Sequence, residues 1–221
     1  MSTESISNLE NPDEAALVVI VDDDGAVRSA LSSLLRSVGF KVEAFGAPKE
    51  LMQKGIPETA SCLVLDVRLP MISGLDFQKQ LAEANHRIPI VFMTGHGDIP
   101  MSVKAMKAGA IDFLPKPFRD QDMLDAVATA IERDRTRRLN EAGLDELRKR
   151  LDSLSKRERE IMAFATVGLM NKQIAGELGI SEVTVKIHRG HVMQKMGARS
   201  FAELVRIAES LGVHPESGTS A

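Results

Sequence analysis

The chain has 221 residues, of which 43% are hydrophobic and 27% charged, with a formal net charge of −3 and one cysteine. This composition is typical of a folded globular protein, and it excludes an intrinsically disordered chain and an internal disulfide framework. Because the first residues lack the basic and apolar parts of a signal peptide, and no apolar run could cross a bilayer, we expect a cytoplasmic protein that does not contact a membrane.

Acidic and basic residues are distributed unevenly along the chain. Residues 1–125 contain 18 Asp and Glu against 12 Lys and Arg, whereas residues 155–221 contain 7 against 9. An acidic front part and a mildly basic back part indicate two modules with different partners. The basic excess is small, so charge alone leaves open whether the second partner is a polyanion.

Strands and helices alternate in the first module. Short apolar runs between polar residues are typical of buried strands, and apolar residues three and four positions apart are typical of helices. The predicted strands are residues 17–21, 42–45, 62–66, 90–94 and 111–114, and the helices between them are residues 27–38, 47–54, 74–84 and 100–108. This alternation predicts an α/β fold with a parallel, doubly wound sheet.

Polar side chains stand where the predicted strands end, which is where such sheets bind ligands. These residues are Asp22, Asp23, Asp66, Thr94 and, after the last strand, Lys116. Carboxylates that lie close together repel unless a cation joins them, so three of them predict a hard divalent ion such as Mg²⁺. A metal-bound aspartate can attack a phosphoryl group, whose oxygens Lys116 and Thr94 would stabilise. For any single residue of the set, a solvated surface position is the simpler interpretation.

The order and spacing of these residues resemble the receiver domain of two-component response regulators, over residues 17–133. The motifs that carry the resemblance are Val21-Asp22-Asp23, Asp66 followed by Leu69-Pro70 and Gly74, Thr94-Gly95, and Ala108-Gly109-Ala110 leading to Lys116-Pro117. The resemblance implies a flavodoxin-like fold with a five-stranded parallel sheet in the order 2-1-3-4-5.

The resemblance also implies a role for each site residue. Asp66 would accept a phosphoryl group from a sensor histidine kinase, and Thr94 would move toward the phosphate. Lys116 would pair with the phosphoryl group, next to a cis peptide to Pro117. Phe113 would be the aromatic switch that turns inward. Mg²⁺ would be held by Asp22 through water, by Asp23 and Asp66 directly, and by the backbone carbonyl of Arg68.

Two other functions would also use these residues. An aspartyl-phosphate hydrolase acting on small molecules needs a second acidic residue two positions after Asp66, where this chain has Arg68. A DNA-binding protein with an inert receiver domain is the second alternative, and the complete acidic set disfavours it. His96 is expected to be an ordinary loop residue and not a ligand.

Residues 119–150 favour a helix, and we predict a helical linker at residues 134–150. Leucines spaced three and four positions apart form a short heptad-like seam at Leu144, Leu147, Leu151 and Leu154. Fewer than two heptads do not establish a coiled coil, so packing within one chain and a dimer contact both remain open.

The second module has the pattern of a helix-turn-helix. Ser155 and Glu158 have the spacing of a capping box, a second helix begins at Asn171, and Ser181 caps a third at residues 182–196. Two helices joined by a tight glycine-containing turn can place the second one in the major groove of DNA.

The third helix of this module has two different sides. Val185, Val192 and Met196 are expected to face the core, and the exposed side is predicted to carry Thr184, Lys186, Ile187, Arg189 and Gly190. Glycine within a helix costs about 1 kcal/mol relative to alanine, so Gly190 suits close approach to a duplex. His188 and His191 have a spacing that could hold a metal, but no acidic or cysteine partner is near them in sequence.

Residues 155–211 resemble the LuxR-type output domain of the NarL/FixJ branch of response regulators. The matching motifs are Leu154-Ser155-Lys156-Arg157-Glu158, Asn171-Lys172-Gln173-Ile174-Ala175 and Thr184-Val185-Lys186-Ile187-His188. The resemblance implies an all-α domain at residues 151–212 with its helix-turn-helix at about residues 171–190. Double-stranded DNA would be contacted by Thr184, Lys186, Ile187 and Arg189, with Asn171 and Lys172 near phosphates. Some relatives have a long polar side chain in place of Gly190, which puts a base contact there in doubt.

Together these features predict a phosphorylation-dependent transcription regulator, an activator and not an enzyme. Phosphorylation would favour a homodimer, with a contact supplied by the last helix, residues 202–211. RNA polymerase would be a further partner. Whether the unphosphorylated state masks the recognition helix or is only monomeric is left open.

Overall fold

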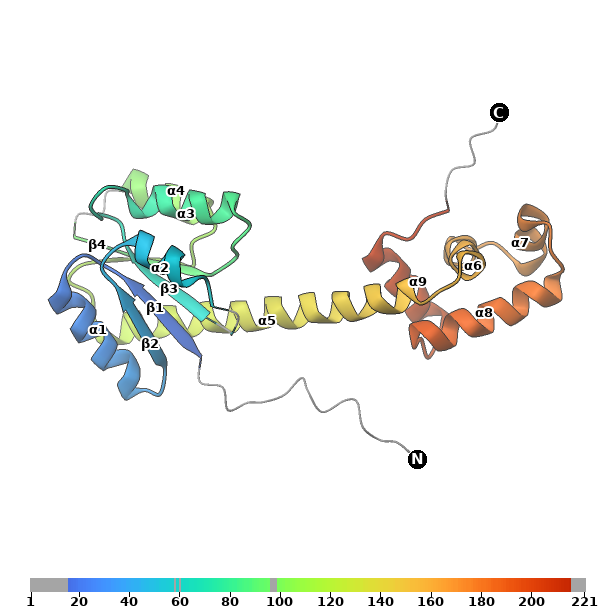
Figure 1. Ribbon diagram of the computed structural model, residues 1–221, viewed down its shortest axis with the longest axis horizontal. Helices are drawn as coiled ribbons and strands as arrows, with labels where there is room; N and C mark the ends of the chain where they lie inside the picture. Colours follow the sequence, from blue (N-terminus) through green and yellow to red (C-terminus); the bar gives the residue numbers. More distant parts are fainter. Residues whose placement is uncertain (1–15, 58, 60, 96–98, 216–221) are drawn as a thin grey trace. The chain divides into compact units, whose positions relative to one another are not determined.

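The computed structural model describes residues 16–57, 59, 61–95 and 99–215 (Figure 1). His96 and the first fifteen residues lie outside this range. Contacts divide the chain into one unit that ends at Arg138 and another that begins at Leu139, and each is described by itself. Within the described part of the chain, no helix has the length and apolar character needed to span a membrane.

The first unit is built around a five-stranded parallel sheet. Its strands are β1 (Leu17–Val21), β2 (Lys41–Phe45), β3 (Ser61–Asp66), β4 (Ile90–Thr94) and β5 (Asp112–Pro115), in the order β2-β1-β3-β4-β5. The predicted fold and strand order are therefore confirmed. Every residue of β3 is buried, as expected for the central strand of a sheet covered on both faces.

The helices α1 (Gly25–Ser37), α2 (Pro48–Lys54), α3 (Gly74–Glu83), α4 (Ile99–Lys107) and α5 (Asp120–Asp152) accompany this sheet. Helices α1 and α5 lie on one face of the sheet, and α2, α3 and α4 lie on the other (Figure 1). Successive side chains of a strand point to opposite faces, so Val18 and Ile20 pack with the first pair of helices, whereas Val19 and Val21 pack with the other three. Helix α1 begins earlier than predicted because Asp24 caps it, accepting hydrogen bonds from two backbone N–H groups of its first turn.

Helix α5 carries a fully buried acid, Asp134, into the first unit. Its carboxylate accepts hydrogen bonds from the backbone N–H of Ser61 at 3.0 Å, from Arg138 Nε at 2.6 Å and from Arg137 Nη2 at 2.5 Å. Arg138 also donates to the backbone carbonyl of Pro57 at 3.1 Å. Hydrogen bonding thus joins α5 to the first residue of β3. The residue that makes this contact, Asp134, is the one at which the sequence pattern predicts the linker to begin.

As far as the structure describes it, the second unit contains the end of α5, from Leu139, and four further helices. They are α6 (Lys156–Thr166), α7 (Asn171–Leu178), α8 (Glu182–Met196) and α9 (Phe201–Leu211). The predicted capping box is present: Ser155 Oγ accepts from the N–H of Glu158, and Glu158 Oε2 accepts from the N–H of Ser155 at 2.8 Å. Leu151 and Leu154, the last two leucines of the heptad-like seam, pack in the core of this unit. These two residues therefore pack within one chain, which is one of the two possibilities that the sequence left open.

Candidate functional site

Three carboxylates lie together at the carboxyl ends of β1 and β3. Asp22 follows β1 directly and Asp66 ends β3, and these strands are adjacent and parallel. One carboxylate oxygen from each of Asp22, Asp23 and Asp66 lies within 4.8 Å of the others. Asp22 and Asp66 are buried, at 0% and 6% exposure, whereas Asp23 is exposed. The structure therefore brings together acids that are 44 positions apart in the sequence.

Lys116 enters the same cluster from the end of β5. Its Nζ lies 2.7 Å from Asp22 Oδ2 and 3.4 Å from Asp66 Oδ1, and its backbone N–H donates to the carbonyl of Thr94 at 2.7 Å. The expected cis peptide between Lys116 and Pro117 is present. Burial by itself would lower the pKa of the Lys116 ammonium, but its hydrogen bond to Asp22 and the two carboxylate charges hold that pKa above its ordinary range.

The electrostatics of Asp66 suit a cation. Burial raises the pKa of the Asp66 carboxyl and the charge of Asp22 adds to the effect, although Lys116 opposes both. Within the described chain, Asp66 Oδ1 is buried and accepts no hydrogen bond. A buried oxygen without a hydrogen bond is costly, even beside the Lys116 ammonium, and it lies among acids whose oxygens are the ligands that Mg²⁺ prefers. The donor set therefore fits a hard divalent ion.

Other contacts fix the backbone that carries these acids. The N–H of Asp24 donates to Asp22 Oδ1 at 2.8 Å, and Arg28 Nη1 donates to the carbonyl of Asp22 at 2.6 Å. A Cβ atom at Gly74 would overlap the backbone carbonyl oxygen of Asp66, so only glycine allows α3 to approach β3 this closely. The sequence pattern did not reveal the role of Arg28, because its partner is a backbone carbonyl across a turn.

Three further residues expected at this site lie on β4, on β5 and in the segment after β3. Thr94 ends β4 and is fully buried. Phe113 is half-buried in β5, with its ring centroid 6.2 Å from that of Phe92. Arg68 comes two positions after the end of β3, and its side chain is exposed. Thr94 therefore lies on the strand next to that of Asp66, and Phe113 lies one strand further along the sheet.

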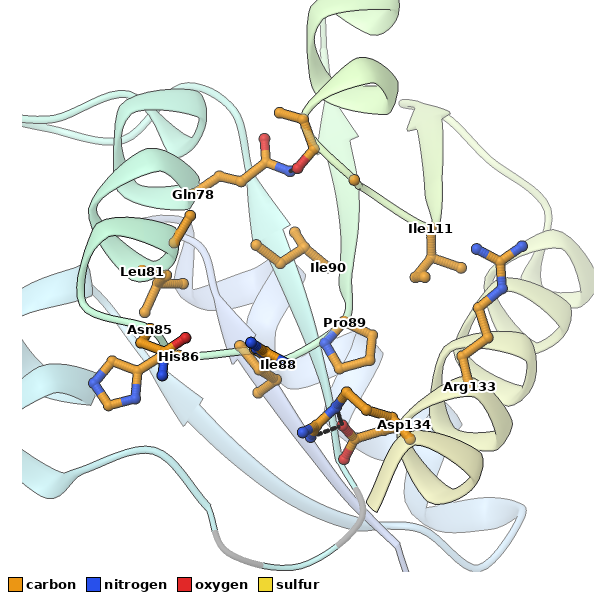
Figure 2. Close-up of a pocket in the computed structure, with 15 residues that line it drawn as sticks. Gln78, Leu81, Asn85, His86, Ile88, Pro89, Ile90, Ile111, Arg133 and Asp134 are labelled. Atoms are coloured by element: carbon orange, nitrogen blue, oxygen red, sulfur yellow. Dashed lines mark hydrogen bonds and ion pairs between the residues drawn. The ribbon is translucent and has the colours of Figure 1, made fainter. Parts of the chain in front are cut away.

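The first unit has a pocket of about 390 Å³ at the amino ends of β4 and β5, at the other end of the strands from the acids (Figure 2). Ile90, the first residue of β4, lines it, together with Ile88, Pro89, Arg133 and Asp134. Since the acids stand at the carboxyl ends of the strands and this pocket at their amino ends, none of the predicted site residues lines it.

In the second unit, α7 and α8 form the predicted helix-turn-helix. Gly179 joins them with a φ of 63°, and Val185, Val192 and Met196 of α8 are buried as expected. Lys186 and Lys172 are exposed, and so is Ile187, at 54%. Val183 is 68% exposed and was missed by the sequence prediction, although exposed apolar residues on a recognition helix can contact thymine methyl groups.

Two residues predicted to be exposed on α8 are instead half-buried. Arg189 Nη1 donates to Asn171 Oδ1 at 2.7 Å, and its guanidinium lies 4.8 Å from the centre of the Phe201 ring. The hydroxyl of Thr184 lies 2.8 Å from that of Ser181. The predicted exposure of Arg189 is wrong because its side chain bends back between α7 and α9.

Replacing Gly190 with Ala is expected to stabilise the second unit by about 0.5–1 kcal/mol, as it does elsewhere in helices. The reason is that Gly190 is exposed and a Cβ atom there meets nothing within 4 Å. If the helix approaches DNA at this position, the same change should weaken DNA binding. Thermal unfolding and a gel shift measure the two effects, and a variant with unchanged DNA affinity would exclude close approach there.

The comparisons agree with both parts of this geometry. The response regulator receiver domain family matches residues 18–128, and the family of bacterial regulatory proteins called luxR matches residues 152–208. The chain is similar to nodulation protein W of Bradyrhizobium diazoefficiens, with 57% identity over 198 residues covering 90% of this chain and 87% of that protein. It is also similar to the response regulator protein TmoT of Ectopseudomonas mendocina, with 49% identity over 199 residues and 90% of each chain covered. The solved structure of response regulator StyR matches with a TM-score of 0.79 at 50% identity, over 88% of this chain and 98% of that one.

Proposed function

This chain belongs to the two-component response regulators that join a receiver domain to a LuxR-type DNA-binding domain, and we propose that phosphorylation of Asp66 controls its binding to DNA. As a member of that family it is a transcription regulator and not an enzyme. The observation that carries the proposal is the buried Oδ1 of Asp66, which accepts no hydrogen bond within the described chain and forms an ion pair with Lys116 at 3.4 Å. We assign residues 17–133 to the receiver, 134–150 to the linker and 151–212 to the DNA-binding domain.

Asp66 acts as the nucleophile toward a phosphoryl donor. Its carboxylate oxygen forms a bond to phosphorus, and the bond between phosphorus and the leaving group breaks. When the donor is a sensor histidine kinase, the leaving group is a histidine nitrogen. Lys116 offers its ammonium to the phosphoryl oxygens, since it already lies 3.4 Å from Asp66 Oδ1. Mg²⁺, held by Asp22, Asp23, Asp66 and the backbone carbonyl of Arg68, would neutralise charge on those oxygens.

The phosphoryl group changes the surface of the first unit through β4 and β5. Thr94 donates its hydroxyl to a phosphoryl oxygen, and Phe113 turns inward into space that the movement of Thr94 leaves. The new charge thereby favours one of two arrangements of the surface around α4 and β5. This arrangement promotes a homodimer, with α9 as a further contact, that spans two half-sites on DNA. Contact with RNA polymerase and activation of a promoter complete the proposal.

The exposed side of α8 enters the major groove. Lys186 and Ile187 are exposed and need no rearrangement to reach bases or phosphates. Lys172, at the start of α7, lies where a helix N-terminus favours a phosphate. Arg189 and Asn171 contact each other in the free chain, so their contribution to DNA binding requires this hydrogen bond to open.

Replacing Lys186 with Ala is expected to weaken binding to the operator and to reduce the slope of affinity against salt concentration by about 1. The reason is the loss of one cation that releases a counterion from the duplex. Gel shifts at several salt concentrations measure both effects, on fragments that the acetyl phosphate-treated protein selects from genomic DNA. Lys149→Ala, an exposed lysine of α5, is the control and should leave the slope unchanged. An unaltered slope for Lys186→Ala would exclude this groove face.

A further inference from the structure

Two histidines of α8 and one glutamate of α6 form a second cluster of possible metal ligands. One ligand atom from each of Glu158, His188 and His191 lies within 4.8 Å of the other two. The sequence pattern disfavours a metal at the two histidines because no acidic partner stands near them in the chain. The fold supplies that partner, since α6 packs against α8 and places Glu158 beside both imidazoles.

The polar contacts of this cluster leave ligand atoms available. Glu158 is buried, and its Oε2 accepts hydrogen bonds from Lys195 Nζ at 2.7 Å and from the N–H of Ser155 at 2.8 Å. Its other oxygen, Oε1, faces His191 Nδ1 at 3.6 Å, beyond hydrogen-bond distance. In the described part of the chain, His188 Nδ1 is buried and has no hydrogen-bond partner.

An orphaned imidazole nitrogen needs an explanation, because buried polar atoms are nearly always paired. A shared proton between His191 and Glu158 would account for one imidazole but leaves His188 Nδ1 without a partner. An ion bound through His188 Nδ1, Glu158 Oε1 and a ring nitrogen of His191 would give each of these atoms a partner. The spacing of one helical turn puts both histidines on the same side of α8, which is what a shared ion requires.

We propose that Glu158, His188 and His191 form a Zn²⁺ site that joins α6 to α8. Two imidazole nitrogens and one carboxylate oxygen are a common ligand set for Zn²⁺, with a water completing the tetrahedron. Metal-to-ligand distances of about 2.0–2.1 Å put the ligand atoms of such a site roughly 3.3 Å apart. The ligand atoms, which lie within 4.8 Å of one another, move closer together on binding, and the exposed His191 side chain is free to rotate toward the other two. Mg²⁺ and Ca²⁺ prefer oxygen ligands only and do not suit this set.

Lys195 decides how tightly the site binds. Its ammonium competes with an ion for the Glu158 carboxylate, so affinity is lower than for a site without a cation. A bound ion stabilises the folded second unit in proportion to its occupancy. Because the ligands come from two different helices, the ion also restrains the position of α8 relative to α6.

Zn²⁺ binding to the untagged full chain tests the proposal by titration calorimetry and equilibrium dialysis. Excess Mg²⁺ and an Asp23→Asn background keep the acidic cluster of the first unit from contributing. His188→Ala and His191→Ala are each expected to weaken Zn²⁺ binding by more than the roughly 10- to 100-fold that loss of an outer-shell partner costs. His214→Ala, an exposed histidine outside the cluster, should bind Zn²⁺ as the parent does.

Two further measurements keep the result independent of folding. Lys195→Met should bind Zn²⁺ more tightly than the parent because the competing cation is gone. Co²⁺ in place of Zn²⁺ should give the strong visible absorption of a low-coordinate site, and circular dichroism verifies that each variant is folded. Equal Zn²⁺ affinity in the parent and in folded His188→Ala and His191→Ala would overturn the proposal, as would a Co²⁺ spectrum of an ion surrounded only by water.

Discussion

Replacing Asp66 with Asn is expected to abolish covalent labelling of the chain by radioactive acetyl phosphate. The amide is not a nucleophile toward phosphorus, while its size allows it to occupy the same buried position at the end of β3. The change also removes one of the three acids of the cluster, so Mg²⁺ affinity should fall. Autoradiography of protein gels run under acidic conditions measures the label, and isothermal titration calorimetry measures Mg²⁺ binding.

Asp125→Asn is a suitable control because Asp125 is an exposed acid of the same unit, in α5. It should be labelled as fully as the parent chain. Chelation of Mg²⁺ should stop labelling of the parent, since the single positive charge of Lys116 does not neutralise three acids and the incoming phosphoryl group. Label that persists in Asp66→Asn would place the acceptor at another residue, and a parent chain that takes no label from any donor would support the inert receiver.

Replacing Asp134 with Ala is expected to destabilise the first unit by about 3 kcal/mol, near the lower end of the roughly 3–5 kcal/mol found when one partner of a buried ion pair is removed. The carboxylate is fully buried and accepts from Ser61, Arg137 and Arg138. Without it, the N–H of Ser61 and both guanidinium groups each lose this acceptor, while Arg138 keeps its hydrogen bond to the carbonyl of Pro57. We expect a loss near the lower end of this range because the side chains of Arg137 and Arg138 are 28% and 29% exposed. Water can therefore reach both guanidinium groups once the carboxylate is removed.

The single cysteine of the chain makes this loss measurable in the first unit alone. Cys62 is fully buried beside Ser61 in β3, and burial, followed by the charge of Asp134, raises the pKa of its thiol. A thiol reagent therefore reacts only when the unit opens, and about 3 kcal/mol corresponds to roughly 100-fold faster labelling, at about 1.4 kcal/mol per factor of ten. The ratio of rates gives this free energy when the reagent is dilute enough that the unit recloses faster than the thiol reacts.

Glu132→Gln is the matched control, because Glu132 is an exposed acid of α5 close to Asp134 in the sequence. This change should alter the rate of Cys62 labelling little. Circular dichroism follows overall unfolding, since the chain has no Trp or Tyr for fluorescence. A labelling rate in Asp134→Ala that stays within a few-fold of the parent would show that water replaces the carboxylate without cost.

The strands and helices of both units could be predicted from the sequence. The apolar run before Asp66 is a buried strand, Ser155 with Glu158 is a capping box, and Gly179 lies in the turn before α8. Each of these signals lies within a few neighbouring residues, where side-chain periodicity and capping chemistry determine the local backbone. The acids at the strand ends were also predictable, because parallel strands bring their carboxyl ends to one edge.

The tertiary structure alone decided three other features. Asp134 stands in a run of charged residues that is typical of a solvated helix face, yet it is fully buried. Arg189 looked exposed, but Asn171 and Phe201 hold it between helices. Glu158 lies beside two histidines that had no acidic neighbour in sequence.

These features share one physical reason. A sequence pattern states which side of a helix is apolar, but not which polar atoms of another element will meet its charged residues. Burial of a charge is favourable only where such partners are already in place, and those partners are distant along the chain. Local order was therefore determined by the sequence within short windows, whereas the pairing of Asp134, Arg189 and Glu158 was determined by the packing of whole elements.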